Sequence, residues 1–415
     1  MKVQRSVFCS MVLIFEFLLI LMGCGGGGCP TVTRTGSSGS GGSGGTKGTS
    51  NVCGTSNGNG SGSGINGQCT GKVSPTEVLY SFDIPTNTNN VANILPFAIA
   101  GNGALTLMCG NASANIGQLA LIGNKFLYAF DSTTAKIAGF SIAHGNSGAL
   151  TAIPGSPFTI SDTFTGFSST NFPRIEADPL GRFVFITNFA ASHIDVFQVD
   201  QTSGALTVAP SSPVPASSPI HLAVEPSGKF VYVPDSQLAL IHVFSIDSAG
   251  NMTTASTFGP LAGTDAPLFI EAHPNGKFLF TANRGSVAAY VIASTTGALS
   301  YAPGSPFNTA SLQVAPLLLT LDATGKFLYV ADTANNGIPG FTVDTTGALT
   351  LINGSPFPGS SVSDLVPNPA GPQLYVQIGN SINVYTIDAT SGALTPPTGQ
   401  AQFFTASNLV IANVQ

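Results

Sequence analysis

Short apolar runs separated by turn residues make up most of the chain after residue 73. One unit shows the pattern clearly, with apolar runs at 268–273, 277–282 and 287–292 and a shorter run at 298–301. Pro274-Asn275-Gly276 and Thr295-Thr296-Gly297 stand between runs, and residues of these types favour tight turns. We therefore predict four short antiparallel strands in the unit. Beyond the N-terminal segment, no stretch has the periodicity of an amphipathic helix.

Two phrases repeat along the chain at a nearly constant spacing. The first resembles Gly-Ala-Leu-Thr and begins at residues 103, 148, 204, 250, 297, 347 and 392, which are 45–56 residues apart. The second resembles Lys-Phe-Leu-Tyr and begins at residues 125, 182, 229, 277 and 326, with a degraded copy at 372. A period of this length is typical of solenoids or propeller blades. Seven copies of a four-stranded unit predict an all-β fold, a seven-bladed β-propeller of antiparallel blades.

The number of innermost strands predicts how the ring closes. Six such strands begin near residues 117, 173, 219, 267, 316 and 363, whereas the Gly-Ala-Leu-Thr phrase occurs seven times. The first copy has a strand at 78–82 without an innermost strand before it, and the segment at 408–412 has no strand after it. We therefore expect the C-terminal strand to complete the first blade, because closure removes exposed sheet edges.

The first 23 residues have the pattern of a secretory signal peptide. Two basic residues precede an apolar run at 7–22, and residues 21–24 read Leu-Met-Gly-Cys, which resembles a bacterial lipobox. The resemblance implies that Cys24 carries a lipid and anchors an exported protein to the bacterial envelope. Gly25 favours the outer membrane. An uncleaved membrane anchor and an ordinary signal peptide are the alternatives.

A stretch rich in Gly, Ser, Thr and Asn occupies residues 24–72. Such a composition buries too little apolar surface to fold, so we predict a disordered linker between the signal and a propeller at 73–415. Cys53 and Cys69 bracket a Gly/Asn/Ser loop in this exported segment. A disulfide between them and two free thiols both remain open.

The composition excludes several classes of function. Charged residues make up only 8% of the chain and the net charge is −6, so no basic surface predicts a nucleic-acid partner. There is no Cys-x-x-Cys pair and only 5 His, so we expect no zinc site. Neither a P-loop nor a Gly-x-Ser-x-Gly elbow is present. We expect a monomer that needs neither a metal nor another cofactor.

The repeat resembles the lactonase family of seven-bladed β-propellers over about residues 73–415. The resemblance rests on residues 219–221, 226–233 and 241–247, which read Pro-Ile-His, Pro-Ser-Gly-Lys-Phe-Val-Tyr-Val and Ile-His-Val-Phe-Ser-Ile-Asp. The family includes bacterial 6-phosphogluconolactonase and muconate-cyclising enzymes. Its members typically carry His after Pro in an inner strand, which is the place of His221 here. They often have Asn-Glu after the second strand, whereas this chain has Asn188-Phe189, Asp235-Ser236, Asn283-Arg284 and Asp332-Thr333.

Candidate site residues occupy equivalent positions in different blades. Arg174 and His221 lie at the start of innermost strands, Glu176 and Glu271 lie on the same strand face, and Arg284 follows a second strand. Because the first two strands of a blade form a hairpin, we expect both arginines and His221 at one mouth of the channel, with the glutamates deeper. Equivalent positions of three other blades hold Phe269, Leu318 and Asp364.

These residue types suit the hydrolysis of a lactone, which needs a base to activate water and cations to stabilise the developing oxyanion. His221 or Glu271 could be the base, and Arg174 and Arg284 could bind the anion. Glu176, close to Arg174, could neutralise it. The alternative is a polar channel lining that holds water, in which Arg174 pairs with Glu176 and His221 is a satisfied buried histidine.

Two functions therefore remain open. The first is an exported lactonase-like hydrolase that acts on a small anionic lactone or related ester. The second is a non-catalytic binding or scaffolding propeller at the cell envelope. The resemblance and the cluster of charged residues favour the first, while the missing Glu after the second strands and the low charge favour the second.

Polar residues at the ends of strands are expected to be structural. Asx side chains bond readily to nearby backbone, so those that end the second strands should form turns. These are Asp131, Asn188, Asp235, Asn283 and Asp332. A second equivalent set flanks the preceding turns and comprises Asp178, Glu225, His273 and Asp322.

Overall fold

The computed structural model describes the repeat region of the chain. The described residues are 74–83, 92–108, 112–114, 118–131, 134–160, 164, 173–259, 266–308, 316–332, 337–379, 381–396, 400–402 and 405–415. Within these ranges the regular structure consists entirely of β-strands. The predicted signal peptide and linker, with Cys24, Cys53 and Cys69, lie outside the described residues.

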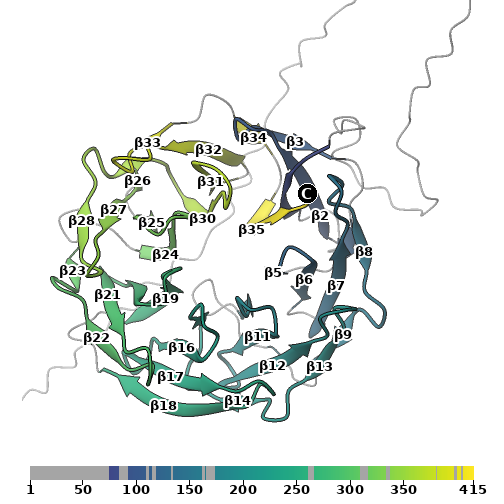
Figure 1. The fold of residues 1–415 in the computed structure, drawn as a ribbon, viewed down its shortest axis with the longest axis horizontal. Coiled ribbons are helices and arrows are strands. Elements are labelled where there is room, and N and C mark those ends of the chain that lie inside the picture. Colours follow the sequence, from purple (N-terminus) through teal and green to yellow (C-terminus); the bar gives the residue numbers. More distant parts are fainter. Residues whose placement is uncertain are drawn as a thin grey trace, which may run out of the picture. The chain divides into compact units, whose positions relative to one another are not determined.

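Seven antiparallel sheets form the blades of a propeller, as predicted (Figure 1). The first blade joins β35 (Thr405–Asn413), β1 (Glu77–Asp83), β2 (Ala92–Ile99) and β3 (Leu105–Leu107), with β4 (Ala112–Ala114) beside β2. The second contains β5 (Gln118–Ile122), β6 (Phe126–Asp131), β7 (Lys136–Ile142) and β8 (Leu150–Ala152). The third contains β10 (Ile175–Ala177), β11 (Phe183–Asn188), β12 (His193–Val199) and β13 (Leu206–Val208).

The remaining blades repeat this order. The fourth contains β15 (Ala223–Val224), β16 (Phe230–Asp235), β17 (Leu240–Ile246) and β18 (Met252–Phe258), and the fifth contains β19 (Pro267–Ala272), β20 (Phe278–Asn283), β21 (Ser286–Ile292) and β22 (Leu299–Tyr301). The sixth contains β24 (Pro316–Leu321), β25 (Phe327–Asp332), β27 (Gly340–Val343) and β28 (Leu349–Leu351), and the seventh contains β30 (Val362–Pro367), β31 (Gln373–Ile378), β32 (Ser381–Ile387) and β33 (Leu394–Thr395). Short rim strands are β9 (Phe158–Thr159), β14 (Val214–Pro215), β23 (Phe307–Asn308), β34 (Gln400–Gln402) and the pair β26 (Gly337–Ile338) and β29 (Phe357–Pro358).

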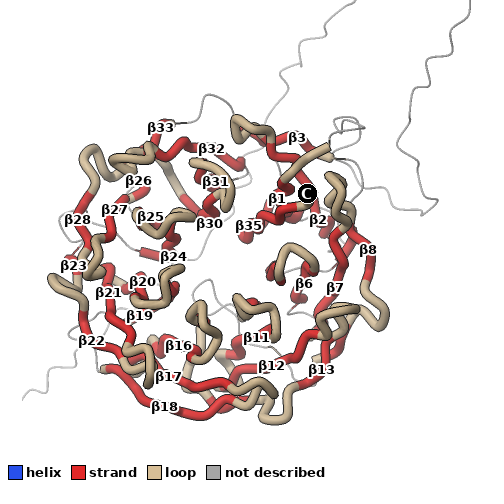
Figure 2. The backbone as a smooth tube through the Cα atoms, viewed as in Figure 1, coloured by secondary structure: helices blue, strands red, loops and turns tan. Residues whose placement is uncertain are grey.

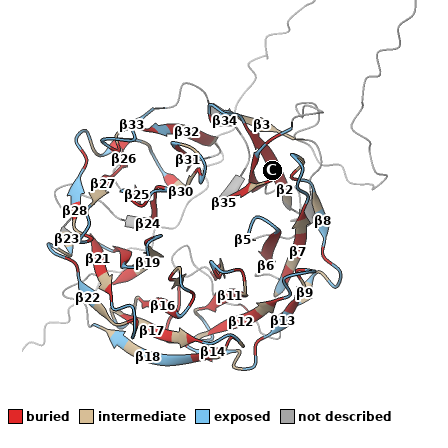
Figure 3. Ribbon diagram, in the orientation of Figure 1, coloured by how far each residue is buried: buried red, intermediate tan, exposed pale blue. Residues whose placement is uncertain are grey.

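The first strand of each blade lies at the centre of the ring and the fourth lies at the rim (Figure 2). Burial follows this order, because the middle strands are sandwiched between neighbouring blades while the rim strands face solvent (Figure 3). All six residues of β11 are buried, whereas two of the three residues of β28 are exposed. The hydrophobic core therefore lies between blades.

The C-terminal strand closes the ring, which confirms the prediction made from the strand count. β35 pairs with β1 in antiparallel register, with Ala412 opposite Val78 and Val410 opposite Tyr80. The backbone N–H of Val414 also donates to the carbonyl of Thr76 at 2.8 Å. Both ends of the described chain are thus held in one sheet, and β1 is paired along both of its edges.

The two repeated phrases meet at the interfaces between blades. In five blades the Tyr of the second strand donates its hydroxyl to the carbonyl of the glycine that opens the Gly-Ala-Leu-Thr phrase of the next blade. The pairs are Tyr80–Gly148, Tyr128–Gly204, Tyr232–Gly297, Tyr329–Gly392 and Tyr375–Gly103, at 2.6–3.0 Å. The repeat thus encodes the contact that joins successive blades.

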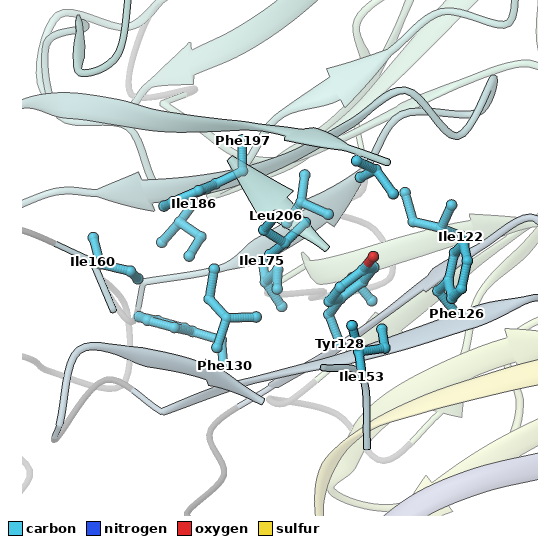
Figure 4. Packing of buried hydrophobic residues seen from close by; sticks show 14 of the residues in the cluster. Ile122, Phe126, Tyr128, Phe130, Ile153, Ile160, Ile175, Ile186, Phe197 and Leu206 are labelled. Atoms are coloured by element: carbon cyan, nitrogen blue, oxygen red, sulfur yellow. The ribbon is translucent and has the colours of Figure 1, made fainter. Parts of the chain in front are cut away.

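Large apolar side chains fill each interface. Between the second and third blades, Phe130 and Ile137 pack with Ile175, Ile186 and other buried side chains of the facing sheet (Figure 4). The rings of Phe130 and Phe164 meet edge to face, with their centroids 5.0 Å apart. Such packing explains why the second strands are apolar on both faces.

The residues that flank the first turn of each blade are structural, as predicted. The Asp322 carboxylate accepts from the backbone N–H groups of Thr324 and Phe327, at 3.0 and 2.8 Å. In the fifth blade His273 has the same role, since its Nδ1 accepts from the N–H of Asn275 and its Nε2 lies 2.9 Å from the carbonyl of Gly325. These polar residues are therefore used by the fold.

Candidate functional site

The register of the inner hairpins defines two layers of side chains along the central channel. The second strand of each blade contains the Tyr or Phe that ends the Lys-Phe-Leu-Tyr phrase or its counterpart. One residue of the innermost strand pairs with this aromatic residue. In blade order this layer comprises Val410, Ala120, Glu176, Ala223, Glu271, Thr320 and Val366. The layer two residues earlier comprises Asn408, Gln118, Arg174, His221, Phe269, Leu318 and Asp364. Because side chains alternate along a strand, the two layers lie on the same face of each inner strand, and all their members except Gln118 and Thr320 line a cavity.

A cavity of about 470 Å³ lies inside the ring and is lined by residues from all seven innermost strands and their flanking loops. Arg174, Glu176, His221 and Glu271 all contribute to its wall. Four of the five candidate residues from the sequence are therefore brought together by the fold. Asp364, which was noted only as an equivalent position, completes the group of ionisable residues on this wall.

Arg284 does not belong to this wall. Its backbone N–H donates to the carbonyl of Ala266 at 3.3 Å, just beyond the end of β20, and the residue is exposed to solvent. Arg284 lies at the edge of the blade that the hairpin predicts, but it is not among the residues that line the cavity. The structure therefore leaves Arg174 as the arginine of the cavity.

His221 and Glu176 form a close side-chain contact across two blades. Nε2 of His221 lies 2.8 Å from Oε1 of Glu176. The imidazole is stacked on the ring of Phe269, with centroids 3.8 Å apart and an interplanar angle of 29°. The His221 side chain is only 6% exposed, whereas that of Glu176 is 31% exposed and so presents its carboxylate to the cavity.

Burial lowers the pKa of the His221 imidazole, and the neighbouring Glu176 carboxylate opposes this shift. The second ring nitrogen, Nδ1, is buried beside the backbone of Ile270 without a hydrogen bond of normal geometry to the described residues. His221 is therefore held by Glu176 on one side and by Phe269 on its face. This arrangement fixes the position of the Glu176 carboxylate.

Arg174 precedes β10 and is anchored through its backbone, since its N–H donates to the hydroxyl of Thr187 at 3.0 Å. Its guanidinium carbon lies 5.6 Å from the centre of the Phe269 ring. Burial lowers the pKa of Arg174, while Glu176 and Asp364 oppose the shift. Because the ordinary pKa of arginine is far above neutral, the side chain stays charged.

Glu271 on β19 is a carboxyl group whose raised pKa favours the protonated form. Burial and, to a smaller extent, the negative charge of Glu176 raise its pKa to about 8, against hydrogen bonds from Leu321 and Thr320 that lower it. Oε1 accepts from the N–H of Leu321 at 3.3 Å. The side chain is half-buried on the cavity wall.

Asp364, at the equivalent position of the seventh blade, is a second carboxyl group with a raised pKa. Burial raises the value to about 6, against the backbone hydrogen bonds and the charge of Arg174. Its two oxygens accept from the N–H groups of Leu365 and Leu409, at 2.8 and 2.5 Å. Its place in the repeat, in line with Arg174 and His221, is the signal that could have identified it.

Several polar side chains of the same layer join adjacent inner strands. Asp364 reaches Leu409 of the first blade, and Oδ1 of Asn408 accepts from the N–H of Leu119 at 2.5 Å. Oε1 of Gln118 accepts from the N–H of Ile175 at 3.2 Å. Three consecutive blade junctions are therefore bridged next to the point where the ring closes. The oxygens of Asp364, Asn408 and Gln118 that accept these N–H groups therefore stabilise the ring and are less available to a ligand.

The described part of the chain holds no group of three or more His, Cys, Asp or Glu arranged to bind a metal ion. In the same ranges no helix has the length and apolar character needed to cross a membrane.

Comparison with known proteins supports the fold. Residues 102–409 match the family described as "Lactonase, 7-bladed beta-propeller". No curated protein shows significant sequence similarity to the chain.

Similar solved structures include the candidate 6-phosphogluconolactonase of Bacteroides fragilis, with 20% identity, a TM-score of 0.62, and coverage of 82% of this chain and 99% of that one. They also include the candidate 6-phosphogluconolactonase of Bacteroides uniformis, with 19% identity, a TM-score of 0.63, and coverage of 81% and 99%. A third is the periplasmic gluconolactonase of Pseudomonas aeruginosa, with 17% identity, a TM-score of 0.63, and coverage of 82% and 99%. At identities of 17–20%, these similarities show a shared fold and do not show a shared substrate.

Proposed function

Because the chain belongs to the lactonase family of seven-bladed β-propellers, we propose that it hydrolyses small lactones or related esters in its central channel. The convergence of Arg174, Glu176, His221 and Glu271 on one cavity supports this proposal. An ester hydrolase needs a base for water, a cation or donor for the carbonyl oxygen and an acid for the leaving oxygen, and this wall holds all three.

We assign the role of base to Glu176. It is the more exposed partner of the His221–Glu176 pair, and the 2.8 Å contact fixes its carboxylate. His221 is buried, stacked on Phe269 and already engaged through Nε2, so it positions the base. The raised pKa of Glu271 suits a proton donor better than a base. Arg174 stabilises the developing negative charge on the carbonyl oxygen.

In this scheme the Glu176 carboxylate takes a proton from water as the water oxygen attacks the lactone carbonyl carbon. The carbonyl oxygen becomes an oxyanion beside Arg174. Its collapse breaks the bond between the carbonyl carbon and the ring oxygen, and Glu271 gives its proton to that oxygen. The product is an open-chain hydroxy acid, and exchange with solvent returns the proton from Glu176 to Glu271.

The charge of the wall favours a neutral substrate over the anionic lactone expected from the sequence. With Arg284 outside the cavity, Arg174 shares the wall with three carboxyl groups, those of Glu176, Glu271 and Asp364. An additional anion would meet the carboxylate of Glu176 at close range. The names of the structural relatives suggest one lactone of each charge to compare as substrates. 6-Phosphogluconolactone is anionic, whereas gluconolactone is neutral.

A non-catalytic binding propeller is the second candidate. No Glu follows the second strands at Asn188, Asp235, Asn283 and Asp332, and the Glu271 carboxyl group is already hydrogen-bonded to backbone. In this case the cavity would bind a lactone or a related small molecule without opening it. We propose in either case an exported protein, anchored to the bacterial envelope through Cys24, and expect no nucleic-acid partner.

The test is hydrolysis of δ-valerolactone, glucono-1,5-lactone and 6-phosphogluconolactone by the purified protein, followed by proton release. We expect hydrolysis of the neutral lactones, and we expect Glu176→Gln to lower kcat by about 10²–10⁴-fold, the usual contribution of a general base. Arg174→Gln should also lower kcat. Arg284→Gln is the matched control, because this arginine is exposed and lies outside the wall, and its activity should equal that of the parent. Activity unaffected by Glu176→Gln would refute the assignment, and binding without hydrolysis would establish the second candidate.

A further inference from the structure

Three polar side chains of the cavity wall are engaged by the backbone of adjacent inner strands. Asn408, Asp364 and Glu271 each use at least one oxygen to accept a backbone N–H from an adjacent inner strand. Asp364 uses both of its oxygens. A ligand with many hydroxyl groups would therefore compete with the contacts that hold the ring together.

The charged groups that remain for a ligand are concentrated on one strand. Arg174 and Glu176 lie two residues apart at β10, and Glu176 keeps 31% of its side chain exposed. His221 supports this pair from the neighbouring blade. Arg174 and Glu176 thus form a polar point on the wall at which an ester group could bind, with Glu271 on the same wall as its proton donor.

The rest of the channel side is mainly apolar. Phe269 and Leu318 lie in the layer of Arg174, on the fifth and sixth blades, and both line the cavity. In the layer of Glu176, Val366 and Val410 line it from the seventh and first blades. Ala223 on the fourth blade is small and leaves room beside the polar pair. Burial of apolar surface against such a wall is favourable and needs no polar partner.

Resting on the proposed function, we infer that the substrate class is a neutral lactone with an alkyl substituent. The ester group would lie at Arg174 and Glu176, and the alkyl chain would pack along Phe269, Leu318 and Val366. Hydroxyl-rich sugar lactones would bind more weakly, because the oxygens of Asn408, Asp364 and Glu271 that could accept from their hydroxyl groups already hold backbone N–H groups.

The experiment compares γ-butyrolactone, γ-hexalactone, γ-octalactone, γ-decalactone and glucono-1,5-lactone with the full-length protein. Hydrolysis is followed by proton release, and binding is followed by calorimetry with the slow variant Glu176→Gln. We expect the dissociation constant to fall by about fourfold for each methylene group that enters the cavity. Glucono-1,5-lactone should bind no more tightly than γ-butyrolactone.

The variant Val366→Thr tests the position of the chain. It keeps the side-chain shape but adds a hydroxyl group to the surface along which the chain would pack, so it should reduce the advantage of γ-decalactone while leaving γ-butyrolactone within a few-fold of its original affinity. Ala223→Leu fills the space beside the polar pair, where the ester group would lie, so it should weaken the binding of every lactone in the series, and a melting curve shows whether each variant is folded.

The outcomes separate this inference from the proposed function. If glucono-1,5-lactone is hydrolysed and chain length has no effect, the substrate class is wrong and the lactonase assignment stands. If alkyl lactones bind in order of chain length without hydrolysis, the ligand class is supported and the catalytic role fails. If none of the lactones binds at millimolar concentration, both are refuted.

Discussion

The contact between the two repeated phrases can be tested with a pair of glycine substitutions. Gly297 opens the fifth copy of the Gly-Ala-Leu-Thr phrase and has φ +69°, while Gly145 has φ +71°. A Cβ atom added at Gly297 would lie 2.5 and 2.6 Å from Cδ1 and Cγ of Phe230, whereas one added at Gly145 would have no atom within 4 Å. The two positions therefore share the backbone conformation and differ in packing.

The expected loss of stability follows from these values. An alanine in the left-handed region costs about 1–2 kcal/mol, and this cost applies to both variants. At Gly297 the new methyl group lies about 1 Å inside normal carbon–carbon contact, and over-packing of this kind costs a further ~1–3 kcal/mol. We expect Gly297→Ala to lower the free energy of unfolding by about 2–5 kcal/mol and Gly145→Ala by about 1–2 kcal/mol.

The assay is chemical denaturation of both variants, followed by intrinsic tyrosine fluorescence and circular dichroism. Effects on the unfolded chain are the same for both substitutions and cancel in the comparison. A Gly297→Ala/Phe230→Ala double variant should lose less free energy of unfolding than the sum of the two single losses, because the shortened side chain removes the steric clash. Equal losses for Gly297→Ala and Gly145→Ala, or strict additivity in the double variant, would refute the proposed packing of the phrases.

Three further predictions concern ring closure, pH and export. Deleting residues 405–415 should prevent folding or lower the melting temperature sharply, because it removes the partner of β1 and the buried side chains of Leu409, Ile411 and Val414, which together stabilise by about 4–9 kcal/mol; a truncated protein as stable as the parent would contradict the closure. The folded protein holds the Glu271 proton up to about pH 8, whereas the unfolded chain releases it near its ordinary pKa of 4.5, so melting temperature should fall as pH rises from 6.5 to 9 and Glu271→Gln should flatten that fall. The lowered pKa of His221 makes stability rise with pH, but only below its ordinary value of 6.5, so it does not contribute between pH 6.5 and 9. If the melting temperature of Glu271→Gln falls with pH as steeply as that of the parent, the raised pKa of Glu271 is refuted. Replacing Cys24 with Ala should move the protein from the membrane fraction to the soluble fraction of fractionated cells, and continued membrane retention would favour an uncleaved anchor.

The sequence by itself determined the architecture because the same local pattern of apolar runs and turn residues recurs seven times. Alternating apolar runs, turn residues and the spacing of Gly-Ala-Leu-Thr specify four strands per blade, and the missing first inner strand specifies closure by the C-terminus. The turn roles of Asp322 and His273 were also readable, because they depend on neighbours two to five residues away. Local rules of this kind depend on few distant contacts.

The composition of the site was decided by the tertiary structure. Whether an arginine lines a channel depends on the direction of its side chain at the end of a hairpin, which separates the exposed Arg284 from Arg174 on the wall. The raised pKa values of Glu271 and Asp364 depend on burial inside a ring assembled from seven distant segments. The pairing of His221 with Glu176 joins residues of different blades, 2.8 Å apart. Desolvation and charge–charge energies change steeply with such distances, and these distances exist only once the ring has closed.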